Sequence, residues 1–277
     1  MRLFCLVALL ACGALVTGCQ STFDQAEQAR KEAGPITEVN AAKMSQVAGV
    51  TAEALAIIPS ADGTTAAVVI KVSAEAAGSS LLWAPIEVKL FDAAGTEVGT
   101  NNIPGALPIL IHLASVQGGK SAYYVNDQIL LSGTPATAEI VVGGELLPID
   151  APDNLATTEP VLVPDPDFGD SWTTTVTNNT DVRQEQLVVQ AIVRDGDTIV
   201  GAGTANIDGL DPGESVDVTG YFIGSSKGKL EVVTPASNAK DGSGAPAPTT
   251  AGSSTTSSSP SESSGSVSTP VMTLQID

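Results

Sequence analysis

Short stretches in which every second residue is apolar, each bounded by a turn-forming sequence, recur along this chain. The clearest are 86–90, followed by Asp-Ala-Ala-Gly at 92–95, and 187–191, followed by the hairpin signal Asp195-Gly196. An apolar period of two buries one face of a β-strand, whereas a helix needs a period near 3.6. Aromatic residues make up 4% of the chain, and the abundant valine, alanine and threonine suit strands with small side chains. The sequence therefore predicts an all-β fold.

The second half of the chain repeats the plan of the first half. When Gly95 is aligned with Gly196, the apolar positions of the two alternating stretches coincide, and Gly-Lys-Ser at 119–121 corresponds to Gly-Glu-Ser at 213–215. The first copy holds seven more residues between these anchors, which we place around 104–108. Internal repetition of this kind indicates two copies of one structural unit.

A segment with five prolines, at 148–166, separates the two copies. Proline has no amide hydrogen to give to a central strand, so the segment is expected to be a linker or an edge. The sequence therefore predicts two tandem β-sandwich domains, one at 47–147 and one at 167–235.

The C-terminal segment 236–277 differs in composition from the rest of the chain, because serine, threonine, glycine and proline fill most of it. Such a segment cannot bury a core, so it is predicted to be a disordered tail that reaches about 30 Å as a flexible coil. The apolar sequence Val271–Ile276 near its end either docks on a sheet edge as an added strand or stays free. The Ser/Thr content also suits O-linked glycosylation.

The N-terminus has the pattern of an export signal. Arg2 precedes an apolar run, Leu3–Val16, that is too short to cross a bilayer as a helix, which needs about 20 apolar residues. The run fits the core of a secretory signal peptide. It ends in Val-Thr-Gly-Cys at 16–19, which resembles the lipobox at which a bacterial lipoprotein is cleaved and lipidated.

The lipobox predicts removal of a signal peptide at 1–18 and lipidation of Cys19 with diacylglyceryl and palmitate chains. Several chains on one residue give the stable membrane anchoring that a single chain does not. Residues 19–46 are then a lipidated N-terminus and a spacer. The alternative is an ordinary signal peptide that happens to contain a cysteine, but no A-x-A-like cleavage sequence precedes Gln20.

The predicted anchor places the chain in a bacterial cell envelope, outside the cytoplasm. Gln20 is not the aspartate that retains lipoproteins at an inner membrane, so in a cell with two membranes we expect the outer one. All three cysteines lie at or before Cys19, so the mature body has neither a disulfide nor a thiolate metal site. The net charge of −19 disfavours binding to nucleic acid.

Residues with the chemistry for catalysis or metal binding are few. His112 is the single histidine and lies in an apolar run, where a structural role is more common than a catalytic one. Asp165, Asp167 and Asp170 lie close enough in sequence to form a calcium site, although the spacing lacks an EF-hand loop. We therefore predict no catalytic residue, no metal ligand and no cofactor, with an acidic linker as the interpretation of the three aspartates.

Three segments of the second copy resemble the FxLYD-type immunoglobulin-like modules of bacterial envelope proteins. They are Val-Thr-Asn-Asn-Thr at 176–180, the Asp195-Gly196 hairpin and Leu-Asp-Pro-Gly-Glu-Ser at 210–215. The first copy has Leu-Phe-Asp at 90–92, close to the aromatic-Asp pattern of the family name, and neither copy has the full F-x-L-Y-D string. The resemblance implies tandem immunoglobulin-like β-sandwich domains, an asparagine segment that precedes a loop, and no catalytic residue.

These observations together predict a membrane-anchored lipoprotein that is not an enzyme and that binds or scaffolds envelope proteins through exposed sheet edges or loops. One alternative is a solute- or ion-binding lipoprotein, which requires a concave, partly apolar pocket. A carboxylate-based hydrolase is a further alternative, which requires converging carboxylates with raised pKa values.

Overall fold

Antiparallel β-strands make up all sixteen named elements of the structure, a computed structural model that describes residues 44–103, 111–164 and 169–245. The prediction of an all-β fold is therefore confirmed. The predicted signal peptide, Cys19 and the tail beyond Ala245 lie outside the described residues. No helix in the described part of the chain is long and apolar enough to cross a membrane.

The first unit consists of two facing sheets. Its strands are β1 Val50–Pro59, β2 Thr65–Ala74, β3 Ser80–Phe91, β4 Glu97–Thr100, β5 His112–Gln117, β6 Ser121–Leu130, β7 Thr137–Val142 and β8 Leu146–Leu147. One sheet has the order β1-β2-β6. The other is centred on β3, with β4 and β5 following one another along one edge and β7 and β8 along the other.

The second unit also consists of two facing sheets. Its strands are β9 Ala156–Thr157, β10 Val161–Val163, β11 Ser171–Thr177, β12 Gln184–Asp195, β13 Thr198–Leu210, β14 Ser215–Tyr221, β15 Ile223–Gly224 and β16 Lys229–Val233. In one sheet β11 lies between β14 and the two short strands β9 and β10. The other sheet has the order β15-β13-β12-β16.

The two units share one pattern of strand pairing, as the internal repeat predicts. β2 pairs with β6 as β11 pairs with β14, and β3 pairs with β7 as β12 pairs with β16. The aligned glycines Gly95 and Gly196 lie in corresponding hairpins, and Ser121 and Ser215 begin the corresponding strands β6 and β14. The extra residues of the first copy lie between β4 and β5, so these two strands together correspond to the unbroken β13.

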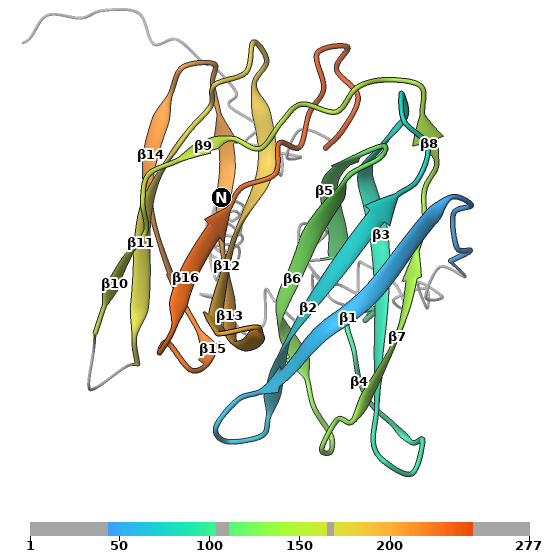
Figure 1. Ribbon diagram of the computed structural model, residues 1–277, viewed down its shortest axis with the longest axis vertical. Helices are drawn as coiled ribbons and strands as arrows, with labels where there is room; N and C mark the ends of the chain where they lie inside the picture. Colours follow the sequence, from blue (N-terminus) through green and yellow to red (C-terminus); the bar gives the residue numbers. More distant parts are fainter. Residues whose placement is uncertain (1–43, 104–110, 165–168, 246–277) are drawn as a thin grey trace, which may run out of the picture.

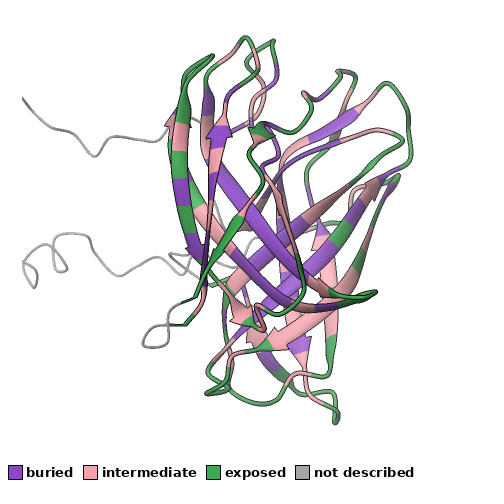
Figure 2. Cartoon of the chain, turned by 60° about the vertical axis from the view of Figure 1, so that its left-hand side comes forward, coloured by how far each residue is buried: buried purple, intermediate pink, exposed green. Residues whose placement is uncertain are grey.

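Four sheets stack in one body, with an apolar cluster between each neighbouring pair of sheets (Figure 1). The outer clusters are the cores of the two units. The middle cluster joins β2 and β6 of the first unit to β12 and β13 of the second; its buried members are Ala67, Val69, Val125, Ile192, Ile199 and Ala202. β2 and β12 are therefore buried on both faces, and Figure 2 shows the buried positions gathered along such central strands.

Polar contacts accompany the middle cluster. The Asp127 carboxylate accepts hydrogen bonds from the Thr204 amide and hydroxyl, both at 2.8 Å. The Arg194 guanidinium donates to the Tyr123 hydroxyl at 3.2 Å and lies 5.7 Å from the centre of the Tyr123 ring. Each buried valine or isoleucine contributes about 1.5–3 kcal/mol, and a net hydrogen bond contributes about 0.5–1.5 kcal/mol. The apolar cluster therefore dominates the joint, and the polar contacts fix its register.

The proline-rich segment 148–166 corrects the predicted linker. Residues 156–157 and 161–163 form β9 and β10 and pair with β11, so they belong to the second unit. Pro160 and Pro164 flank β10, which is an edge strand, the position in a sheet that tolerates proline. The residues that cross between the units, along the top of Figure 1, are also held: the Leu155 amide donates to the Thr234 carbonyl at 2.8 Å. Part of the segment predicted to be a linker or an edge thus forms the edge strands β9 and β10.

The predicted start of the tail at 236 is also corrected, because the second unit continues to Ala245. Ala236, Ser237 and Ala239 are buried although they lie beyond the last strand. Small side chains allow this stretch to pack closely against the sheet, and its amides bond to polar groups of the second unit. A composition of serine and alanine carries no apolar period, which is why the sequence pattern did not reveal this part of the core.

Candidate binding cleft

A cleft of about 570 Å³ opens on one side of the second unit, where it meets the end of β6. Strands β13 and β14 form its walls, and β6 forms part of its rim. The lining residues are Asp127, Gln128, Thr204, Ala205, Asn206, Ile207, Val216, Asp217, Val218, Thr219, Gly220 and Tyr221. Protein pockets for small ligands have volumes of about 300–1,000 Å³, so this cleft has the size of a binding site.

One edge of β14 faces no strand partner among the described residues, while β11 pairs with the other edge. At the start of β14 the Asn178 amide donates to the Glu214 carbonyl at 2.9 Å. Even-numbered residues of β14 therefore direct their backbone groups toward β11. Because backbone groups alternate in direction along an antiparallel strand, those of Asp217 and Thr219 point to the open edge.

The neighbouring edge of β13 is open over most of its length as well. Away from β12, β13 pairs in the described structure with the two-residue strand β15 alone. The Ser225 amide donates to the Val200 carbonyl, and the Thr204 amide donates to Asp127, each at 2.8 Å. Even-numbered residues of β13 thus face away from β12, and Asn206 presents its backbone groups at the cleft without a strand opposite.

Both ends of the cleft are closed by the chain itself. At one end the chain leaves β14 and enters β15, and so crosses from one sheet to the other. At the other end a tight turn joins β13 to β14, with the Glu214 amide donating to the Asp211 carbonyl at 3.0 Å. Gly213 in this turn has φ 78°, a conformation that favours glycine. The turn and the crossing hold the two edges apart at fixed positions.

Core residues of the second unit form the floor of the cleft. Ile207 and Val218 lie in the apolar cluster between the two sheets. Trp172 is fully buried beneath Gly220, where a Cβ atom on the glycine would lie 2.4 Å from the indole ring. The indole nitrogen of Trp172 has no hydrogen-bond partner among the described groups. The floor is therefore closely packed and depends on a glycine at 220.

The charged groups of the cleft are acidic. Asp127 and Asp217 are among the lining residues, whereas no Lys, Arg or His is present among them. Burial raises the pKa of Asp127, and the hydrogen bonds from the Thr204 hydroxyl and amide lower it by less. The Asp217 carboxylate accepts a hydrogen bond from the Thr175 hydroxyl at 2.7 Å. The two carboxylates are thus held by different elements, and the hydrolase alternative, which needs two converging carboxylates, stays a prediction.

Of the residues considered from sequence for catalysis or metal binding, the two that the structure describes, His112 and Asp170, are not among those that line the cleft. His112 on β5 stacks on Trp83 of β3, with ring centres 4.8 Å apart and planes 5° apart. Asp165 and Asp167 lie outside the described residues, and Asp170 accepts a hydrogen bond from Ser226. Among the residues that the structure describes, no group of three or more His, Cys, Asp or Glu side chains has the arrangement of a metal site.

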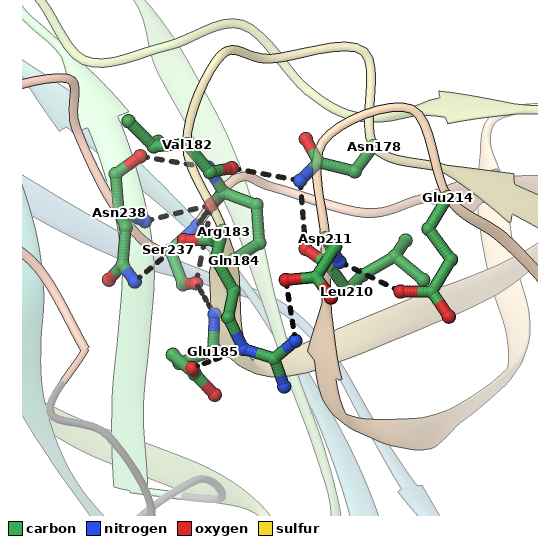
Figure 3. Close-up of polar contacts among 10 residues, drawn as sticks. All are labelled: Asn178, Val182, Arg183, Gln184, Glu185, Leu210, Asp211, Glu214, Ser237 and Asn238. Carbon is green, nitrogen blue, oxygen red and sulfur yellow. Dashed lines mark hydrogen bonds and ion pairs between the residues drawn. The ribbon is translucent and has the colours of Figure 1, made fainter.

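Two of the three segments that carry the FxLYD resemblance, 176–180 and 210–215, meet at one end of the second unit (Figure 3). The third, the Asp195-Gly196 hairpin, lies at the opposite end of β12 and β13. The Asn178 side chain donates to the Leu210 and Val182 carbonyls, both at 2.8 Å, so it ties the asparagine segment to the later turn. Asn178 directly follows β11 and Ser215 begins β14, as the resemblance implies. The contacts of these two segments serve the fold.

A buried glutamine extends the same cluster to the C-terminal segment. The Gln184 side-chain oxygen accepts from the amides of Ser237 and Asn238 at 2.8 and 2.9 Å, and its nitrogen donates to the Asn238 carbonyl at 3.0 Å (Figure 3). An unsatisfied buried amide costs about 1–3 kcal/mol, so these bonds explain how residues after β16 stay on the unit. Sequence reasoning missed Gln184 because its partners lie far along the chain.

Sequence reasoning also missed Asp127, Thr204 and the open edge of β14. The alternating pattern Ser-Val-Asp-Val-Thr-Gly-Tyr of β14 predicts a strand. It carries no signal that distinguishes a paired edge from an open one. The available signal was the difference in spacing between the two copies. It indicates that β13, the strand across the cleft from β14, differs from its counterpart in the first copy, which is divided into β4 and β5.

No family model and no curated protein sequence matches this chain. Among solved structures, the crystal structure of red sea bream transglutaminase is similar in part, with 13% sequence identity and a TM-score of 0.21. The similarity covers 78% of this chain and 32% of the transglutaminase chain. A TM-score of this size carries no argument about the fold or the activity of this protein.

Proposed function

We propose that this chain is a lipoprotein of the bacterial cell envelope, anchored through Cys19, that binds envelope proteins by accepting an extended segment at the open edge of β14. The observation that carries the proposal is the cleft between the edge of β14, which has no strand partner among the described residues, and the edge of β13, which pairs there with β15 alone. Strand addition to such an edge supplies main-chain hydrogen bonds, and side-chain pockets beside the edge supply specificity. Natural proteins normally protect open edges, so an edge kept open beside a cleft suits binding.

The finer description of the fold belongs to the same proposal. The two units are immunoglobulin-like sandwiches in tandem, the second of FxLYD type. Their common pairing pattern and the meeting of the two FxLYD segments at Asn178 support this assignment. A body of stacked sheets without a loose hinge between the units, attached to a membrane by its N-terminus, presents the cleft in a fixed orientation to other envelope proteins.

Site-specific photocrosslinking in the cells that make the protein tests the binding site. A photoreactive amino acid at position 206, in the cleft, should give a defined adduct with an envelope protein, whereas the same group at exposed position 139 on β7 should not. Thr219→Pro should abolish the adduct because it removes an amide that points to the open edge. Thr219→Val keeps that amide and should preserve the adduct. Equal adducts in all four cases would exclude the β14 edge as the binding site.

The anchor has its own test. Cys19→Ala should leave the unprocessed precursor or release the protein from membranes, with a change in electrophoretic migration and loss of incorporated radiolabelled palmitate. Ser21→Ala is the matched control, because it changes a residue beyond the lipobox. Membrane retention and migration equal to those of the wild type would refute lipidation of Cys19.

A solute-binding lipoprotein is the second candidate, because the cleft has the volume of a ligand pocket and Ile207 and Val218 in its floor. The variant Thr219→Pro separates the two functions. It removes a backbone donor from the edge and leaves the floor unchanged, so a bound solute should tolerate it and a bound strand should not.

A further inference from the structure

The faces of β14 restrict the kind of segment that an added strand can be. Val216 and Val218 direct their side chains to the inside of the unit, while Asp217, Thr219 and Tyr221 are exposed on the outer face of the sheet. Side chains directly opposite one another on neighbouring strands lie about 4.5–5.5 Å apart and interact on the same face. An added strand therefore needs alternating residues, with one set directed to the cleft and the other set on the outer face.

The set directed to the cleft faces a small apolar surface. Val218 and Ile207 form part of the floor, and the Trp172 ring packs directly against Gly220 beneath it. Apolar side chains of moderate size, such as valine, cover this floor and remove apolar surface from water. Charged side chains in the same positions lose hydration without an opposite charge on the floor.

The outer set faces an acidic residue and an aromatic residue. Asp217 is exposed, and the cleft offers it no basic side chain among the lining residues. Tyr221 is 58% exposed, and it shares a cross-strand row with Ser171 and with Val163, which is 40% exposed. The outer face therefore has an acidic position and an apolar position, four residues apart along β14.

We infer that the segment bound at β14 is an extended polypeptide with apolar side chains at alternate positions, a lysine or arginine opposite Asp217, and an aromatic or aliphatic residue four positions away, opposite Tyr221. This inference rests on the proposed function and names the class of its partner. The charge of the whole chain, −19, favours the approach of a basic segment over an acidic one.

Synthetic peptides on the full-length protein test the inference. The peptide Tyr-Val-Thr-Val-Lys-Val-Thr-Val-Tyr places its lysine opposite Asp217 and a tyrosine opposite Tyr221 in either strand direction, because its sequence is symmetric. Its matched partner has glutamate in place of lysine. Isothermal titration calorimetry should show that the lysine peptide binds about tenfold more tightly, since the exchange turns a cross-strand attraction into a repulsion.

Variants of the protein show whether the difference arises at Asp217. Asp217→Asn should reduce the preference for the lysine peptide to about twofold or less, and Asp217→Lys should reverse it. A peptide with the same composition but with lysine at one end should lose the preference. A preference for lysine that survives Asp217→Lys would overturn the inference, because the attraction would then come from the general acidic surface.

Backbone changes separate a failure of this inference from a failure of the proposed function. In the peptide, N-methylation of both threonines removes amides that an antiparallel added strand uses, and N-methylation of the two valines beside the lysine removes those of a parallel one. The methylation that matches the strand direction, and Thr219→Pro in the protein, should each abolish binding. If both peptides bind equally and both lose binding after these changes, strand addition stands and the basic partner is wrong. If neither peptide binds at millimolar concentration, or if the backbone changes have no effect, both are wrong.

Discussion

The two units share their main strand pairings but differ on one side, and the difference places the cleft in the second unit. In the first unit β4 approaches the end of β6: Gly99 bridges Leu131, and the Ser132 amide donates to the Val98 carbonyl at 2.8 Å. In the second unit the corresponding strands, β13 and β14, have no such bridge among the described residues, and the cleft lies between them. The same strand pairing is thus found with this side closed in the first unit and with a cleft at this side in the second.

The cause of the difference lies in the residues between the paired strands. In the first copy the strand beside β3 is interrupted between Thr100 and His112, so β4 is short and free to bend toward β6. In the second copy β13 pairs with β12 along its whole length, from Thr198 to Leu210, and so stays with its own sheet. The extra residues of the first copy, which the sequence shows as an insertion, therefore lie in the unit in which β4 and the end of β6 are bridged.

The largest expected effect is the loss of stability when the Trp172 ring, which packs beneath the cleft of the second unit, is removed. Trp172→Ala should lower the free energy of unfolding by about 3–5 kcal/mol, because a buried aromatic residue leaves a cavity. Denaturant titration followed by circular dichroism measures the change. Tyr221→Ala, at an exposed position of the same sheet, should cost about 0.5 kcal/mol or less. Equal costs for the two variants would mean that Trp172 is not the core of the second unit.

A smaller effect should follow from forcing the closed side open. Gly99→Val introduces a Cβ atom that would lie 2.9 Å from the Leu130 carbonyl oxygen, and overpacking of this kind costs about 1–3 kcal/mol. The control Glu97→Val adds the same side chain at an exposed position of the same strand. Thermal unfolding compares the two, and a Gly99→Val protein as stable as the control would show that the bridge to Leu131 contributes little.

The smallest expected effect is a change in how stability depends on pH. It arises from Asp127, which lies at the joint between the two units. Burial raises the pKa of Asp127 above the ordinary value of 3.8, so the folded state holds the proton more tightly than the unfolded state. The contribution of Asp127 to stability is then greatest below pH 3.8 and falls as the pH rises through the raised value. Asp127→Asn cannot ionise and should lack this decline.

Denaturant titrations of wild type and Asp127→Asn at a series of pH values measure the difference between the two proteins. Asp62→Asn is the control with the opposite sign, because hydrogen bonds from Ser60 and Thr64 lower the pKa of exposed Asp62, so its contribution is lost as the pH falls. Parallel pH curves for wild type and Asp127→Asn would contradict the assigned burial of Asp127.

Local features of the fold were predictable from the sequence, because period-two patterns and turn residues act over a few positions. The hairpins at Gly95 and Gly196, and the correspondence of the two copies, follow from such patterns. The packing of the units against each other had a sequence signal that was not used: 66–70 and 187–193 are almost continuously apolar, which is typical of strands buried on both faces. A strand of a separate domain, with one face in solvent, needs apolar residues only at alternate positions.

The candidate site was predictable only as a class, since an exposed sheet edge was expected but not located. Its formation depends on Thr204 bonding to Asp127, 77 residues away in the chain, and on β14 having β11 as its single strand partner within the described part of the chain. Contacts at such separations leave no local pattern. The same reason applies to Gln184, whose bonds to Ser237 keep residues beyond β16 on the second unit.

Amide hydrogen exchange on the full-length protein tests the open edge most directly. In the free protein the amides of Asp217 and Thr219 should exchange quickly, while that of Val218, which faces β11, should be protected. Addition of the lysine peptide should protect Asp217 and Thr219 and leave Val218 unchanged. Protection of all three amides in the free protein, or rapid exchange at Asp217 and Thr219 in the saturated complex, would contradict strand addition at β14.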